Sequence, residues 1–388
     1  MSVVTDDLYR NERYKFGTKK LEQEEFAHHV EQVRAVQKRL AAEHFAGVPK
    51  RVFHAKAHAS LVGTLTLRAG RPLEVRHGIF ADHGVERYKV LARLSNGNGV
   101  EAHDLKPDVR GLALKIFGVN DSADTQTPPE GKCVDWLMTN STNPFGRDQQ
   151  EFVEFMQANA GTFLEFGEFC VEHPEVFGLL VKATGRVVSS LATEQYWSGH
   201  PYLLGPDRAM KFNIAPDMAA DSSPGLADDH AEASRLNSLV HRAIHEVDDI
   251  EERLKRWFDA HRPETSPLHA DYLRRDLLHR LGRAPIRYTL SVQLEKDPHR
   301  TPIENTLVEW EERESPSIPV ADLEFVRESF QDAEPLRFSP AHFSSDHRPL
   351  GNLARGRLFT YTASQDGRGA HKTEPDGAGS FSHDVGGL

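Results

Sequence analysis

The sequence of 388 residues has two cysteines, no long apolar run and no excess of basic charge. Cys133 and Cys170 are too few for a disulfide scaffold or a cysteine-rich metal site. No window holds about eighteen uninterrupted apolar residues, so no membrane span is expected. The formal net charge of -11 argues against a nucleic-acid-binding protein, which normally carries a basic stripe.

The composition also divides the chain. Residues 1–16 form a polar arm that lacks the apolar core of a signal peptide, so a cytoplasmic protein is expected. Residues 17–372 have the length of a single large domain. Residues 373–388 are rich in Gly, Asp and Ser, and we expect a disordered tail there.

Hydrophobic patterning predicts an α+β fold. Segments rich in β-branched residues, separated by Gly, Asn and Asp turns, favour antiparallel strands in a barrel or a sandwich. These segments are 59–68, 89–95, 110–117, 133–138, 202–216 and 288–295. Helical periodicity predicts helices over 21–45, 149–168, 175–192, 233–261 and 268–281. A last helix is expected from about residue 352, with Gly367 near its end.

This last helix places Arg357 one turn before Tyr361, so a guanidinium can touch a phenol. A positive charge within about 4–6 Å favours the phenolate, a hard anionic ligand that suits ferric iron. Arg368 falls on the same face of the helix. The face therefore offers an anionic ligand between two arginines, which suits haem iron and its propionates. The spacing is also common on surface helices, and a simple stacking contact remains an alternative.

Several other segments, in order along the chain, resemble those of catalases. RVFHAK at 51–56 is similar to the distal-histidine signature, and RLS at 93–95 is similar to an Arg-Phe-Ser segment. Asn140 opens a loop where the family has a distal asparagine, and GRLFTY at 356–361 resembles the proximal-tyrosine motif. Further similar segments are 109–115, 196–205, 211–212, 301–310 and 318–320. The likeness covers roughly residues 50–370.

The resemblance implies a catalase-like antiparallel β-barrel, surrounded by helices, that encloses haem b with ferric iron. His54 would take a proton from peroxide and return it, Ser95 would orient His54, and Asn140 would hold the peroxide oxygen. Tyr361 would be the metal ligand. The other cofactor-binding residues would be Arg51, Phe53, Arg93, Phe145, Phe152, Phe155, Arg357 and Arg368. His58, close to the distal histidine, is expected to face outward from its strand.

The implied function is a haem-dependent hydroperoxidase that decomposes hydrogen peroxide through an oxoferryl intermediate. Phe53 stands where the family usually has a small branched residue, and NSTN at 140–143 replaces the usual Asn-Asn-Thr-Pro. These departures keep open a catalase-related peroxidase, or an enzyme that converts organic or fatty-acid hydroperoxides. A haem-binding sensor or storage protein is the alternative without catalysis.

The resemblance also bounds the assembly. The chain stops soon after the proximal motif, so the C-terminal domain of longer catalases is not expected. The segment at about 217–285 has no counterpart in the family, and we interpret it as a helical insertion. Its amphipathic helix at 233–261 favours a homo-oligomer, with a dimer as the simplest case. NADPH binding is not expected, because no residues match that site.

Overall fold

The computed structural model describes residues 8–82, 84–119, 132–217, 225–245, 263–329 and 333–370, with four further positions between 252 and 259. The predicted tail at 373–388 and residues 1–7 of the predicted arm lie outside the described residues, as do residues 218–224 and most of 246–262 in the predicted insertion. None of the described helices is long and apolar enough to cross a membrane.

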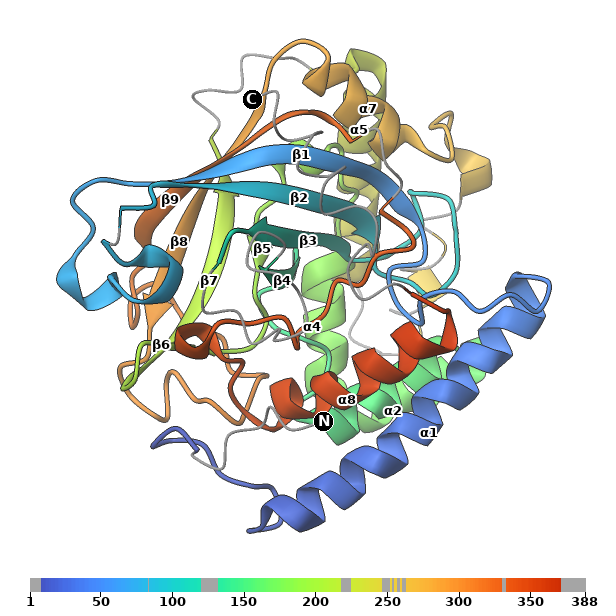
Figure 1. Cartoon of the computed structure of the whole chain (residues 1–388). Coiled ribbons are helices and arrows are strands. Elements are labelled where there is room, and N and C mark those ends of the chain that lie inside the picture. Colours follow the sequence, from blue (N-terminus) through green and yellow to red (C-terminus); the bar gives the residue numbers. More distant parts are fainter. Residues whose placement is uncertain are drawn as a thin grey trace.

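Antiparallel strands form a closed barrel (Figure 1). Neighbouring strands follow the order β5-β4-β3-β2-β1-β9-β8-β7, and β5 also pairs with β7, which closes the ring. Strand β6 is added at the edge of β7. The strands are β1 (Ala57–Leu67), β2 (Arg87–Asn96), β3 (Arg110–Phe117), β4 (Cys133–Thr139), β5 (Tyr196–Trp197), β6 (Tyr202–Leu204), β7 (Arg208–Pro216), β8 (Ile286–Leu294) and β9 (Ile318–Glu328). The predicted α+β fold with an antiparallel barrel is confirmed.

Alternation along the strands gives the barrel wall two different faces. On one face, Leu112, Trp136 and Met138 are buried in the main core, and the Trp136 ring stacks on Phe212 with centroids 4.4 Å apart. On the other face, the register brings Ser95, Gly111 and Thr139 into one row across β2, β3 and β4. The neighbouring row consists of Arg93, Ala113 and Leu137. This second face carries the candidate site.

In Figure 1, one group of helices packs together below the barrel, and a second group lies above it. The lower group is α1 (Lys19–His44), α2 (Gln149–Asn159) and α8 (Asn352–Gly367), while α5 (Ala227–His245) and α7 (Tyr272–Leu281) form the upper group. Further helices among the described residues are α3 (Phe163–Glu172) and α4 (Pro174–Thr184). Short 3-10 turns occupy Leu73–Val75, Gly78–Phe80, Leu191–Thr193, Pro263–Thr265 and Ser345–His347.

The helix predicted over 149–168 is two helices, because a cap interrupts it. The Thr162 hydroxyl accepts the backbone N–H of Glu165, and the Glu165 carboxylate accepts the backbone N–H of Thr162. This reciprocal capping box starts a new helix at Phe163.

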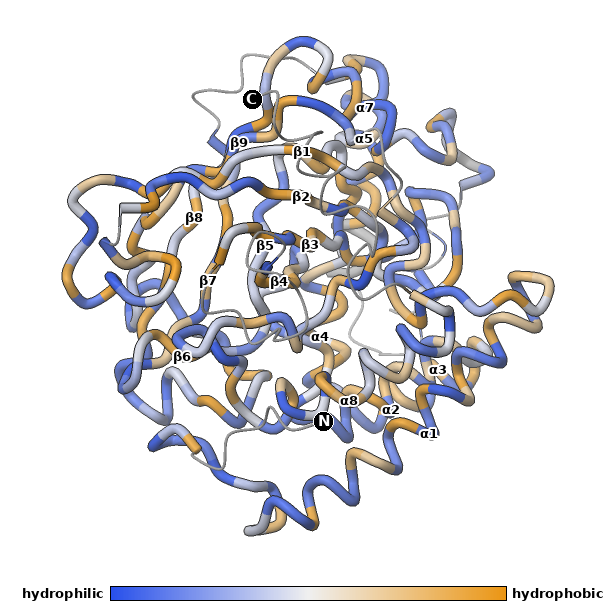
Figure 2. The backbone as a smooth tube through the Cα atoms, in the orientation of Figure 1, coloured by the Kyte–Doolittle hydropathy of each residue, from blue (hydrophilic) through white to orange (hydrophobic). Residues whose placement is uncertain are grey.

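Hydrophobic and hydrophilic residues alternate along α1 (Figure 2), whose buried side chains include Phe26 and Val33. The amphipathic pattern therefore predicted this helix over 21–45, close to its observed bounds Lys19–His44.

A buried ionic cluster fixes the start of α8. Arg355 donates from Nε to Glu22 of α1 and from Nη1 to Glu12 of the N-terminal segment, both at 2.7 Å. Glu12 also accepts the backbone N–H of Gly351 at 2.9 Å, and Asn352 donates to Glu22 at 2.9 Å. The first turn of α8 is thus bonded to α1 and to the N-terminal segment.

The expectation for His58 was wrong. The side chain is buried, and its Nε2 lies 2.7 Å from the Asn96 Oδ1. Asn96 also contacts Asp104 at 3.0 Å, so His58 belongs to a polar network inside the fold. His58 lies at a register shift of β1, between Ala57 and Ala59, and segments distant in sequence cover it.

Candidate active site

One cavity gathers nearly all of the predicted site residues. It lies between the second face of β2, β3 and β4 and the helices α1, α2 and α8. The predicted residues on its wall are Arg51, Phe53, His54, Arg93, Ser95, Phe145, Phe152, Phe155, Arg357, Tyr361 and Arg368. Asn140 is the predicted residue that the structure does not bring to this wall.

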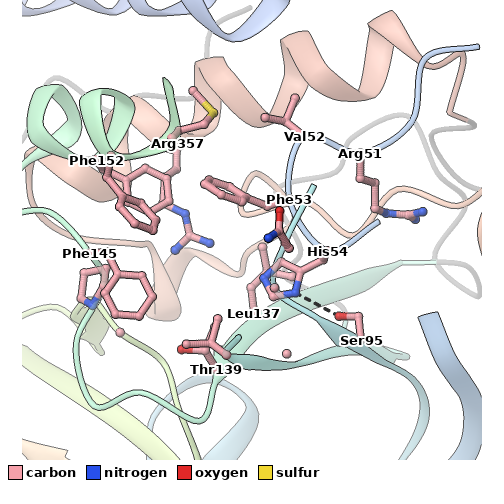
Figure 3. Close-up of a pocket in the computed structure, with 18 of the residues that line it drawn as sticks. Arg51, Val52, Phe53, His54, Ser95, Leu137, Thr139, Phe145, Phe152 and Arg357 are labelled. Atoms are coloured by element: carbon pink, nitrogen blue, oxygen red, sulfur yellow. Dashed lines mark hydrogen bonds between the residues drawn. The ribbon is translucent and has the colours of Figure 1, made fainter. Parts of the chain in front are cut away.

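His54 is held by its backbone and by its ring. Its φ of 61° lies in the left-handed region, which is rare for a residue with a side chain. The backbone N–H of His54 donates to the Gly97 carbonyl at 2.8 Å, and Arg93 donates to the His54 carbonyl at 2.9 Å. The His54 Nδ1 lies 3.0 Å from the Ser95 hydroxyl (Figure 3). Such over-determined strain is typical of functional sites.

The surroundings of His54 keep the ring neutral. Burial lowers the pKa of His54 to about 3, and the positive charges of Arg93, Arg357 and Arg51 act in the same direction. A neutral imidazole has one nitrogen able to accept a proton. The ring also lies directly over Gly111: a Cβ there would be 2.4 Å from Cε1 of His54. Gly111 therefore gives His54 its place on the barrel wall.

The α8 side of the cavity presents the predicted arginine–tyrosine pair. Arg357 donates from Nη2 to the Tyr361 hydroxyl at 2.8 Å, and its guanidinium carbon lies 4.8 Å from the centre of that ring. Near this pair, burial lowers the pKa of His200 well below its usual value, and the charge of Arg357 lowers it further. The Arg357 Nε, the His200 Nε2 and the Tyr202 hydroxyl are buried without a hydrogen-bond partner among the described residues. Buried polar atoms without partners are rare and call for an explanation, such as a ligand.

Phenylalanines make part of the cavity wall apolar. The rings of Phe53 and Phe155 are stacked with centroids 6.1 Å apart, and Phe53 lies 5.6 Å from Phe152. Phe145 adds a further contact to Phe155 at 5.1 Å. The predicted phenylalanines thus form one apolar cluster on the cavity wall.

Three of the four predicted arginines of the site contact the segment of Glu334 and Leu336, which follows β9. Arg51 and Arg93 both contact the carboxylate of Glu334, and Arg368 donates to the backbone carbonyls of Glu334 and Leu336, at 2.8 Å each. Burial lowers the pKa of Arg368 to about 10. Glu334 was not predicted as a site residue, because its contacts join positions far apart in the chain.

Asn140 faces away from the cavity. Its Oδ1 accepts the backbone N–H of Arg110 and its Nδ2 donates to Glu194, both at 2.8 Å. Thr139, one position earlier, lines the cavity instead, together with Leu137 (Figure 3). Sequence reasoning missed Thr139, although the two-residue period of β4 places residues 137 and 139 on one face.

No protein-family model matches the sequence, and no curated protein matches it. Solved structures do match. A fungal catalase has a TM-score of 0.62 and 17% identity, and the match covers 83% of this chain and 59% of that chain. Catalase A from Saccharomyces cerevisiae has a TM-score of 0.61 and 16% identity, with 83% and 61% covered. A bacterial catalase has a TM-score of 0.59 and 17% identity, with 87% and 60% covered.

These matches establish that the chain has the catalase fold. The match spans about three fifths of the length of the catalases. Structural similarity at 16–17% identity shows the fold alone, and the chemistry depends on the residues of the site.

Proposed function

We propose that this protein is a haem-dependent hydroperoxidase of the catalase type. The observation that carries the proposal is one cavity with two chemically different sides. The barrel side presents His54 with Ser95, and the α8 side presents Arg357 with Tyr361. The two pairs are far apart in sequence, and both line the same cavity.

The residues present fit a haem b with ferric iron. Tyr361 would be the iron ligand, and the adjacent Arg357 donates a hydrogen bond to its phenol oxygen at 2.8 Å. The phenylalanine cluster offers an apolar surface for a porphyrin, and Arg51, Arg93 and Arg368 offer charged donors for its propionates. The buried Arg357 Nε that has no partner among the described residues also supports a ligand at this place.

The haem would supply the redox chemistry that cleaves the peroxide O–O bond. His54 is neutral at pH 7, so it accepts the proton of one peroxide oxygen and returns it to the other. Ser95 holds the ring through Nδ1, which leaves Nε2 for that proton. No distal role is proposed for Asn140, because its amide is committed to the barrel wall. Thr139 lines the cavity, and its hydroxyl, which lies 3.4 Å from the backbone of Ser141, is the proposed polar group on this side.

Hydrogen peroxide is the proposed substrate, and an organic hydroperoxide is the second candidate. The second candidate is favoured by Phe53, which stacks on Phe155 and so extends the apolar wall directly beside His54. An apolar wall of this kind would accept the hydrocarbon part of a larger hydroperoxide.

The test is reconstitution with haem, followed by an absorption spectrum and by oxygen measurement with hydrogen peroxide. The wild-type protein is expected to bind haem stoichiometrically and to release oxygen. His54→Ala should retain haem and lose at least 100-fold of the rate, on the order of the contribution of a general acid–base residue. Tyr361→Phe should lose or loosen haem. A wild-type protein that binds no haem would refute the proposal, and haem binding with turnover of organic hydroperoxides alone would select the second candidate.

A further inference from the structure

The carboxylate of Glu334 lies among the arginines of the site. Its Oε1 accepts from Arg93 Nε at 2.5 Å, and its Oε2 accepts from Arg51 Nη1. The Glu334 carbonyl accepts from Arg368 Nη1 at 2.8 Å and from Arg51 Nη2 at 3.1 Å. All three arginines line the cavity. One residue therefore meets every guanidinium that is proposed to hold the carboxylates of a ligand.

The backbone around Glu334 is anchored, whereas its side chain reaches solvent. Ala333 and Leu336 are buried in a small apolar cluster with Phe338. The Leu336 N–H donates to the Ala333 carbonyl at 3.1 Å, which closes a turn around Glu334. The Glu334 side chain is 39% exposed, so its carboxylate can exchange the arginines for water without moving the backbone.

The net charge of this cluster matches that of a ligand with two carboxylates. Three guanidinium groups carry three positive charges, and the Glu334 carboxylate cancels one, which leaves two. A haem with two propionates carries two negative charges. However, an N–H of Arg51 or Arg93 that donates to Glu334 is not available to a propionate. A ligand carboxylate therefore competes with Glu334 for the same donors.

We propose that Glu334 is an internal counter-ion that keeps Arg51 and Arg93 ordered before the ligand binds and is displaced by a ligand carboxylate. Glu334 is thus a specificity-determining residue: it weakens the binding of a ligand whose carboxylate has to displace it, and it leaves the affinity for a ligand without carboxylates unchanged. The ligand's identity as haem rests on the proposed function, whereas the counter-ion role in the ligand-free protein does not.

Glu334→Gln tests this role, and Asp366→Asn is the matched control. Asp366 pairs with Arg337 at 2.7 Å near the end of α8, so its loss removes the same charge without touching the three arginines. Haem affinity is measured by absorbance titration of the apoprotein, in parallel with haem dimethyl ester, whose carboxylates are blocked. Glu334→Gln is expected to tighten haem binding by about tenfold, the scale of one partly exposed charged hydrogen bond. The ester should bind the variant and the wild type equally, and Asp366→Asn should change neither affinity.

A second readout needs no haem. Without its counter-ion, the arginine cluster repels itself, so Glu334→Gln should melt at a lower temperature than Asp366→Asn in the ligand-free state. Unchanged or weaker haem binding by Glu334→Gln would overturn the proposal, as would an equal gain for the ester. If no protein binds haem, the proposed function fails, and the melting comparison alone decides the counter-ion role. Equal melting temperatures for the two variants would overturn that role.

Discussion

Gly111→Ala should displace the distal histidine while leaving the rest of the site in place. A Cβ at this position would lie 2.4 Å from Cε1 and 2.5 Å from Nδ1 of His54, and 2.9 Å from the Ser95 hydroxyl. Relaxed contacts between carbon atoms are about 3.5–4.0 Å, so the ring has to move by roughly 1 Å. Overpacking of this kind costs about 1–3 kcal/mol of stability. A misplacement of about 1 Å costs on the order of 100-fold in rate.

The assay compares peroxide turnover and the haem spectrum of Gly111→Ala with those of the wild type. Turnover should fall by about 100-fold, because the histidine no longer meets the peroxide in the productive position. The haem spectrum should persist, because Arg357 and Tyr361 lie on α8 and not on β3. Gly178→Ala in α4 is the control: an added Cβ there has no neighbour within 4 Å. That variant should be fully active and slightly more stable.

A double variant separates the clash from any general weakness of β3. In a His54→Ala background the imidazole is gone, so the added methyl group has room. The cost of Gly111→Ala to the free energy of unfolding should therefore shrink by at least half in that background. Full activity in Gly111→Ala would refute the reasoning, as would an equal cost with and without His54.

Three further predictions concern other residues. Arg355→Met leaves its buried carboxylate partners uncompensated and should cost about 3–5 kcal/mol in urea unfolding at pH 7, whereas a loss below about 1 kcal/mol would contradict the role of this cluster. Burial opposes protonation of His342, but the Asp135 carboxylate outweighs it and raises the pKa of His342 to about 9. The resulting stabilisation is present below a pH of about 6.5 and is lost as the pH rises through about 9, so His342→Gln should be less stable than wild type by about 3 kcal/mol at pH 6 and nearly equal to it at pH 10. Thr139→Val should reduce peroxide turnover by about tenfold with an unchanged haem spectrum, and unaltered turnover would exclude a role for the hydroxyl.

The sequence was most informative where a local pattern decides the structure. Strand β3 was predicted at its observed bounds, because apolar residues and turn signals delimit it. The arginine and tyrosine of α8 were predicted to meet because a helix brings residues four apart together, and they do so at 2.8 Å. Closure of the barrel was not predictable in this way. It depends on β5, which consists of Tyr196 and Trp197 alone and is too short for a periodic signal.

Contacts between distant segments account for the other failures. His58 was expected to face outward from its strand, yet its side chain is buried in a polar network that includes Asp104. Glu334 meets Arg93 across more than 200 positions of sequence, because β9, which precedes Glu334, lies next to β1 and β1 lies next to β2 in the sheet. Propensity and spacing describe neighbours along the chain, so they carry no information on such pairs.

The distal side of the site follows from the register of three strands. The row of Ser95, Gly111 and Thr139 crosses β2, β3 and β4 on the cavity face, and a glycine in its centre leaves the space that the His54 ring fills. Side chains alternate along β4, so Thr139 and Asn140 cannot both face the cavity while Asn140 bonds the backbone of Arg110. The fold therefore presents a hydroxyl where the motif alone suggested an amide. An Asn140→Ala variant should accordingly lose stability, through the unpaired Arg110 N–H and Glu194 carboxylate, before it loses any step of peroxide chemistry. Comparison of its melting temperature with its turnover per bound haem measures the two effects separately. A fall in turnover at unchanged melting temperature would contradict this prediction and would indicate a role for Asn140 in the peroxide chemistry.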